Sequence, residues 1–198
     1  MRQENLVKKF VLGLIVGLLL PVVGGYLFIT MGKMPVETSS PPLPMEEKIA
    51  HRALAARIGK AAQKSSPIPA DEANMTQGAR LYAENCAFCH GLPGQSPTKA
   101  AKGMFPLPPQ LLNKEEMVTD DPVGATYWKV SNGIRLTGMP GFGEMLSENQ
   151  VWQLSQMLKN ADKLPPATMA ALTKPAEAAA PAATPAPAQT PPAKPKKK

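Results

Sequence analysis

Hydrophobic and polar positions follow two different patterns along this chain. Phe10 to Met31 is an uncharged apolar run, whereas apolar positions beyond residue 70 recur at helical spacing between loops rich in proline and glycine. A helix of about 22 residues is about 33 Å long, and the hydrocarbon core of a bilayer is about 30 Å thick. The first pattern therefore predicts a membrane-spanning helix over residues 10–31, and the second predicts a small helical domain.

The residues that flank the apolar run indicate its orientation. Arg2, Lys8 and Lys9 precede the run and only Lys33 closely follows it, so the positive-inside rule places residues 1–9 in the cytoplasm and the rest of the chain outside. A cleaved signal peptide is the alternative. Its apolar region is usually about 7–15 residues long and ends at a small-residue site, so we predict an uncleaved anchor.

Residues 32–70 are predicted to form a stalk. The prolines of residues 35–44 favour an extended backbone, and residues 45–64 are predicted to be helical with only a narrow apolar stripe. His51 lies beside this stripe. We interpret it as a solvated histidine, with distal iron ligation or metal binding as the alternative.

The segment 71–162 is predicted to contain three principal helices, and the loop 91–110 is too rich in proline for a regular element. Capping signals give the expected helix ends, which in chain order are Asn74 with Gln77, Asp121-Pro122 with Asn132-Gly133, and Ser147 with Gln150.

The segment 163–198 is rich in alanine, proline and lysine and is predicted to be a disordered tail. Its terminal lysines could contact an anionic membrane or an acidic partner, but a solubilising spacer is the simpler interpretation.

Composition and charge support a small domain with long attachments. Aromatic residues make up 5% of the chain, and the net charge of +7 is unevenly distributed. Residues 71–162 contain seven basic and ten acidic residues, so the basic excess lies outside the predicted domain. This distribution argues against nucleic-acid binding.

The most specific chemical motif is the string Cys86-Ala87-Phe88-Cys89-His90. Two thiols three positions apart can form thioethers to the vinyl groups of a haem, and the histidine that follows can ligate the iron. A redox dithiol and half of a zinc site are the alternatives. A zinc site needs about four ligands, and the chain has no other cysteine and only one other histidine.

With this motif, the helices around it and the string Gly138-Met139-Pro140, residues 74–162 resemble a class I mono-haem cytochrome c of the membrane-anchored bacterial type. The resemblance implies an all-α fold around one covalent haem c, with His90 and Met139 as the axial iron ligands. Met104, Met117 and Met145 also follow the motif, but only Met139 lies in a loop braced by proline and glycine.

The resemblance also implies roles for several other residues. Gly78, Tyr82 and Trp152 occupy the places where such proteins cross their first and last helices, although Met157 stands where many relatives have an aromatic residue. A proline carbonyl orients the ligating histidine in the family, and the candidates are Pro106, Pro108 and Pro109. Trp128 and Arg135 are candidates for hydrogen bonds to the haem propionates, or else a core indole and a solvated arginine.

With both axial positions filled, the iron has no vacant site for a substrate, and we predict a one-electron carrier that is not an enzyme. The alternative is a haem c subunit that accepts electrons within a multiprotein oxidoreductase. A peroxidase or a gas sensor would need an open or labile sixth position. The expected partners are redox proteins, with no nucleic acid. The expected location is the bacterial inner membrane, with the haem domain on the periplasmic side.

Overall fold

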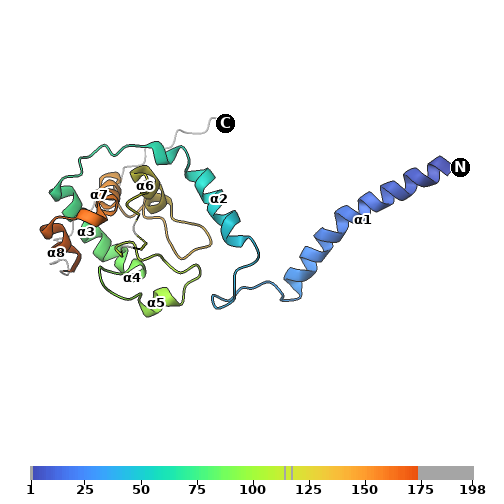
Figure 1. Cartoon of the computed structure of the whole chain (residues 1–198), viewed down its shortest axis with the longest axis horizontal. Helices are drawn as coiled ribbons and strands as arrows, with labels where there is room; N and C mark the ends of the chain where they lie inside the picture. Colours follow the sequence, from blue (N-terminus) through green and yellow to red (C-terminus); the bar gives the residue numbers. More distant parts are fainter. Residues whose placement is uncertain (1, 114, 117, 174–198) are drawn as a thin grey trace, which may run out of the picture.

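The computed structural model describes residues 2–113, 115–116 and 118–173, and these residues form eight α-helices, two 3-10 helices and no strand (Figure 1). The sequence prediction of an all-α fold is therefore confirmed. Seven of the α-helices belong to the part of the chain that follows the apolar run, and α1 (Arg2–Thr30) extends away from them.

Helix α1 has the properties of a membrane span. The most apolar stretch of its segment Asn5–Thr30 has a mean hydropathy of 2.4, and none of this stretch is buried against the rest of the described chain. The helix continues through Pro21, which membrane helices tolerate. Its length and composition are compatible with a single-pass anchor.

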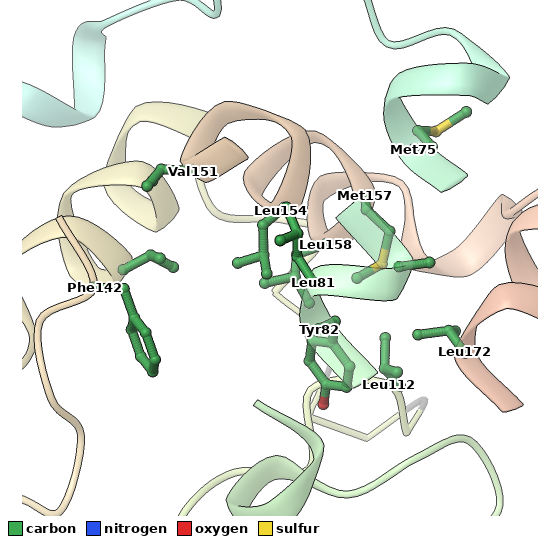
Figure 2. Packing of buried hydrophobic residues seen from close by; sticks show 12 residues of the cluster. Met75, Leu81, Tyr82, Leu112, Phe142, Val151, Leu154, Met157, Leu158 and Leu172 are labelled. Atoms are coloured by element: carbon green, nitrogen blue, oxygen red, sulfur yellow. The ribbon is translucent and has the colours of Figure 1, made fainter. Parts of the chain in front are cut away.

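The core of the haem-motif domain is built where α3 (Glu72–Asn85) crosses α7 (Glu148–Lys159). A Cβ atom on Gly78 would lie 2.7 Å from the carbonyl carbon of Gln153, so only glycine lets the two backbones approach so closely. Figure 2 shows Leu81 and Tyr82 of α3 beneath Leu154 of α7.

Helix α6 (Val123–Asn132) packs against α7 and completes this core. Met157, at the position where an aromatic residue was expected from the family, is fully buried in the same cluster. A flexible thioether side chain fills irregular space well, so the crossing is retained without the aromatic ring.

Most helix ends follow the sequence signals, with two corrections. The predicted cap at Asp121 is wrong by one residue, because Pro122 is the N-cap of α6 and no side chain caps that end. Ser147 and Gln150 form the predicted capping box of α7, and Gly133 ends α6. The cap of α3, however, is Asp71, whose carboxylate accepts a hydrogen bond of 2.8 Å from the backbone N–H of Asn74. The predicted cap at Asn74 is wrong because an aspartate three residues earlier provides a charged acceptor at the positive end of the helix.

The folded part of the chain also extends beyond the predicted boundary at residue 162. Helix α8 (Pro166–Thr173) packs on α3, where Leu172 is buried and the Thr168 and Thr76 hydroxyls lie 2.9 Å apart. The sequence prediction took Pro165-Pro166 as the start of a disordered tail, but proline is also favourable in the first turn of a helix. Residues 174–198, with the terminal lysines, lie outside the described residues.

Several further elements lie outside this core, and one of them, the 3-10 helix η2 (Ala161–Lys163), lies between α7 and α8 in the sequence. Helix α2 (Glu46–Ile58) ends at Gly59, and the 3-10 helix η1 (Ala61–Gln63) replaces the last part of the helix predicted over 45–64. The loop 91–110 contains one turn of helix, α5 (Lys99–Lys102), which the sequence prediction missed. The hydroxyl of Thr98 caps it by accepting from the N–H of Ala101 at 3.1 Å.

Candidate haem-binding site

The two cysteines and the histidine of the motif lie on a single turn. Helix α3 ends at Asn85, and the chain continues at once into α4 (Ala87–His90), where the N–H of His90 donates to the carbonyl of Cys86 at 2.9 Å. Gly91 ends this turn with a φ of 71°, a conformation that favours glycine. The motif is therefore held by the end of the central helix.

A backbone carbonyl orients the ring of His90. Its Nδ1 lies 2.8 Å from the carbonyl oxygen of Pro109, and because a carbonyl can only accept, the hydrogen of the ring is on Nδ1. Nε2 then keeps its lone pair for a metal. Of the three candidate prolines, Pro109 makes this contact.

Burial lowers the pKa of His90, while the hydrogen bond to Pro109 acts in the opposite direction and is the smaller effect. The imidazole is therefore neutral at physiological pH, which is the form that ligates metals.

Tyr82 fastens the turn that follows the motif to α3. Its hydroxyl donates to the carbonyls of Gly91 at 2.9 Å and His90 at 3.2 Å. Burial raises the pKa of Tyr82, with Cys86 adding to the effect, so the phenol stays protonated and remains a donor. Tyr82, predicted only as a packing residue, therefore also fixes the backbone of the motif.

The cysteines are half-buried free thiols. Burial, followed by the proximity of Cys89, raises the pKa of Cys86 to about 12, so this thiol lacks the lowered pKa of a redox-active dithiol. Among the described residues no three histidine, cysteine, aspartate or glutamate side chains converge to hold a metal ion. Both observations disfavour the two alternative interpretations of the motif.

The loop that carries Met139 is tied to the end of α6. The N–H of Ile134 donates to the carbonyl of Met139 at 3.1 Å, and the N–H of Phe142 donates to the carbonyl of Val130 at 2.9 Å. Gly133 has a φ of 67°, and a Cβ there would lie 2.6 Å from the carbonyl carbon of Pro140. The loop therefore closes tightly on the helix.

Met139 itself is half-buried against the hydrophobic core. Of the other methionines considered, Met104 places its terminal methyl against Gly138, and Met145 is exposed. Met117 lies outside the described residues. Met139 remains the predicted axial ligand.

Two other predicted site residues lie in different surroundings. The ring of Trp128 has the guanidinium of Arg57 5.7 Å from its centroid, a cation–π arrangement, and Arg135 is exposed. Their contacts with haem propionates stay predictions. His51 is exposed on α2.

Three buried side-chain polar atoms without a hydrogen-bond partner in the described part of the protein were not predicted from the sequence. Trp152 stacks on Tyr127 with ring centroids 4.0 Å apart, and its Nε1 is buried without a hydrogen-bond partner in the described part of the protein. The same is true of the Ser131 hydroxyl and of Oε1 of Gln110. Buried polar groups usually have partners, so these atoms are consistent with a polar group that the polypeptide itself does not supply.

Two free thiols on one turn and an imidazole with a free Nε2 fit a haem c, and Met139 on its braced loop stays the predicted sixth ligand. Together with the helical fold, these features support a class I c-type cytochrome domain.

The family model that matches is described as cytochrome c oxidase, cbb3-type, subunit III, and it covers residues 73–158. The match supports a c-type haem-binding domain with an electron-transfer role over this segment, and its single motif is consistent with one haem c. Searches of curated proteins and of solved structures gave no match.

Proposed function

We propose that this protein is a membrane-tethered mono-haem cytochrome that carries single electrons between redox partner proteins and catalyses no reaction of its own. The observation that carries the proposal is the Met139 loop, which hydrogen bonds fasten to the end of α6. A thioether held in this way would occupy the sixth coordination position and leave no site for a substrate.

Each site residue has a definite task in this proposal. Cys86 and Cys89 would hold the haem through thioether bonds, while His90 and Met139 would ligate its iron. Pro109 keeps the hydrogen of the His90 ring on Nδ1, which would leave the lone pair of Nε2 for the iron. The bound haem supplies the one-electron redox centre, and the thioether ligand favours its ferrous state.

The proposed location follows from α1 and its flanking charges. We place residues 1–9 in the cytoplasm of a bacterial cell, α1 in the inner membrane and the haem domain on the periplasmic side, because positive charge precedes the span.

A second candidate function is a haem c subunit of a multiprotein oxidoreductase, and the description of the matching family, an oxidase subunit, favours it. Gentle detergent extraction followed by native electrophoresis separates the two candidates. Migration of the haem stain as a monomer supports the free carrier, whereas migration with a larger complex that retains oxidoreductase activity supports the subunit.

Optical spectroscopy of the purified full chain tests the carrier proposal. The ferric protein should show the weak long-wavelength band of a thioether-to-iron bond, and the ferrous protein should bind carbon monoxide poorly because the gas must first displace sulfur. Ready binding of carbon monoxide by the wild-type protein would indicate an open sixth position and a peroxidase or sensor instead.

A further inference from the structure

The segment between the membrane helix and the haem domain is in direct contact with α6. Ile58, the last residue of α2, is buried, with 6% of its surface exposed, although most of α2 is exposed. The following 3-10 helix η1 packs on α6. We call residues 46–64, which comprise α2 and η1, the strap.

Only glycine fits at position 124, in the first turn of α6, because the backbone of the strap lies against it. A Cβ at this position would lie 2.6 Å from the carbonyl oxygen of Lys64 and 3.0 Å from that of Ala62, with the carbonyl of Ala61 closer still. All three obstructing atoms belong to the backbone, so no side-chain rotation could relieve the overlap. Glycine is a poor residue for a helix, and the strap contact gives a physical reason for its presence in α6.

A second contact lies one turn further along the same helix. The guanidinium of Arg57 lies 5.7 Å from the ring centroid of Trp128, within the range of cation–π attraction. The strap thus meets α6 through a backbone contact that requires glycine and through a cation over an aromatic ring, and the adjoining Ile58 is buried.

Docking of the strap on α6 shortens the free linker and so limits the distance between the haem domain and the membrane. With the strap docked, only residues 31–45 are free, and about 15 extended residues reach at most roughly 50 Å. With the strap released and α2 still helical, residues 59–71 also become free, and the reach rises to roughly 110 Å.

We propose that the strap keeps the haem domain close to the membrane surface, where it serves a membrane-bound redox partner. This inference rests on the proposed function, because it assigns the tether a role in electron transfer. A shorter tether raises the effective concentration of the haem domain around a partner in the same membrane. The partner that this arrangement suits is a membrane protein with a redox centre close to the membrane surface on the side of the haem domain.

Limited trypsin digestion of the full chain in lipid vesicles tests the docking. Lys33 lies in the free linker and should be cleaved in every variant, which makes it an internal control. Lys60 and Lys64 flank η1 and should be cleaved at least about tenfold more slowly than Lys33 in the wild type, because cleavage there requires the strap to leave α6.

Gly124→Ala should abolish this protection, and so should Ile58→Asp, which places a charge at the buried last residue of α2. Gly103→Ala is the matched control, because its Cβ would meet only an ordinary contact of 3.5 Å. An alanine in the first turn of a helix otherwise favours the helix, so unchanged protection and a higher melting temperature for Gly124→Ala would overturn the docking.

The distance between the haem domain and the membrane is tested in vesicles that contain a lipid with a fluorescent headgroup. The haem quenches the emission of this headgroup at short distance. Quenching should be strong in the wild type and in Gly103→Ala and should fall in Gly124→Ala and Ile58→Asp, while reduction by soluble dithionite stays unchanged. Equal quenching in all four proteins would overturn the inference. Failure of the proposed function is recognised separately, by ready binding of carbon monoxide to the ferrous wild-type protein, and both strap experiments use the haem-bound full chain.

Discussion

At the level of single residues, the braced thioether of Met139 is what distinguishes a carrier from a catalyst. Met139→Ala should abolish the long-wavelength band of the ferric protein, lower its reduction potential and accelerate carbon monoxide binding by the ferrous form, because the sixth position opens. Absorption spectroscopy, a redox titration and stopped-flow mixing with carbon monoxide measure the three effects.

The matched control for this prediction is Met145→Ala. Met145 has 63% of its surface exposed and should leave the spectrum unchanged. Met104→Ala should also keep the band, although its terminal methyl lies against Gly138 beside the ligand loop. If Met139→Ala has the same spectrum as the wild type, the assignment of Met139 as the axial ligand is contradicted.

The two free thiols lead to a second residue-level prediction. Because Cys86 and Cys89 are both expected to form thioethers, extraction with acid and organic solvent should leave the haem on the polypeptide, and mass spectrometry should find the mass of one haem added. The double variant Cys86→Ala with Cys89→Ala should release its haem. Release from the wild type, or thiols that react with Ellman's reagent in the haem-bound protein, would contradict the covalent assignment.

The sequence predicted the chemistry of residues that are neighbours in the chain, but it did not predict contacts between distant residues. The string from Cys86 to His90 carries its chemistry in five neighbouring residues, so spacing alone indicated haem. The choice of Pro109 over its neighbours depends on how a loop nineteen residues away folds back on His90. The buried indole nitrogen of Trp152 likewise becomes visible only when its whole surroundings are known.

At the level of helices, the α3–α7 crossing depends on Gly78. Gly78→Ala should destabilise the domain by about 1–3 kcal/mol, because the added Cβ meets the backbone of Gln153 and the helices must separate. This loss should exceed the helix-propensity gain of about 1 kcal/mol that alanine brings. Urea unfolding followed by circular dichroism measures it, with Gly103→Ala as the control, and an unchanged midpoint would show that the helices do not meet at Gly78.

Helix α8 is expected to contribute to stability as part of the domain. Leu172 is buried, with 1% of its surface exposed, so Leu172→Ala should lower the free energy of unfolding by about 2–5 kcal/mol. Met169 on the same helix has 38% of its surface exposed, and Met169→Ala should cost much less. Equal, small losses in thermal unfolding for both variants would place α8 outside the cooperative unit.

Helices with strong caps and periodic apolar positions could be predicted, but elements stabilised mainly by tertiary contact could not. The capping box at Ser147 was found because both of its partners lie within four residues. The sequence predicted a helix over 45–64, and α2 lies there, but the packing of η1 on α6 was not predicted. Helix α8 was not predicted either, because its burial depends on a surface that α3 provides.

At the level of the whole molecule, the described chain combines an exposed apolar helix, a short linker and a helical haem domain bound to its own strap. The basic residues lie mostly outside the mildly acidic segment 71–162. This arrangement suits a protein whose anchor sets its place while its domain meets other proteins, because a membrane helix is held by burial and is insensitive to salt.

The last prediction concerns the anchor itself. Because α1 offers a stretch of mean hydropathy 2.4 that the described part of the chain does not bury, the full chain should remain in the membrane fraction after washing with carbonate or high salt and should require detergent for release. Immunoblotting of the fractions with haem staining measures this. Lys60→Gln with Lys64→Gln, which removes two positive charges from the strap, is the matched control and should partition identically, since charge does not hold the anchor. A shortened haem-stained protein that begins near Lys33 and appears in the wash would show that the segment is cleaved. The haem domain would then no longer be attached to the membrane, and the strap could not hold it there.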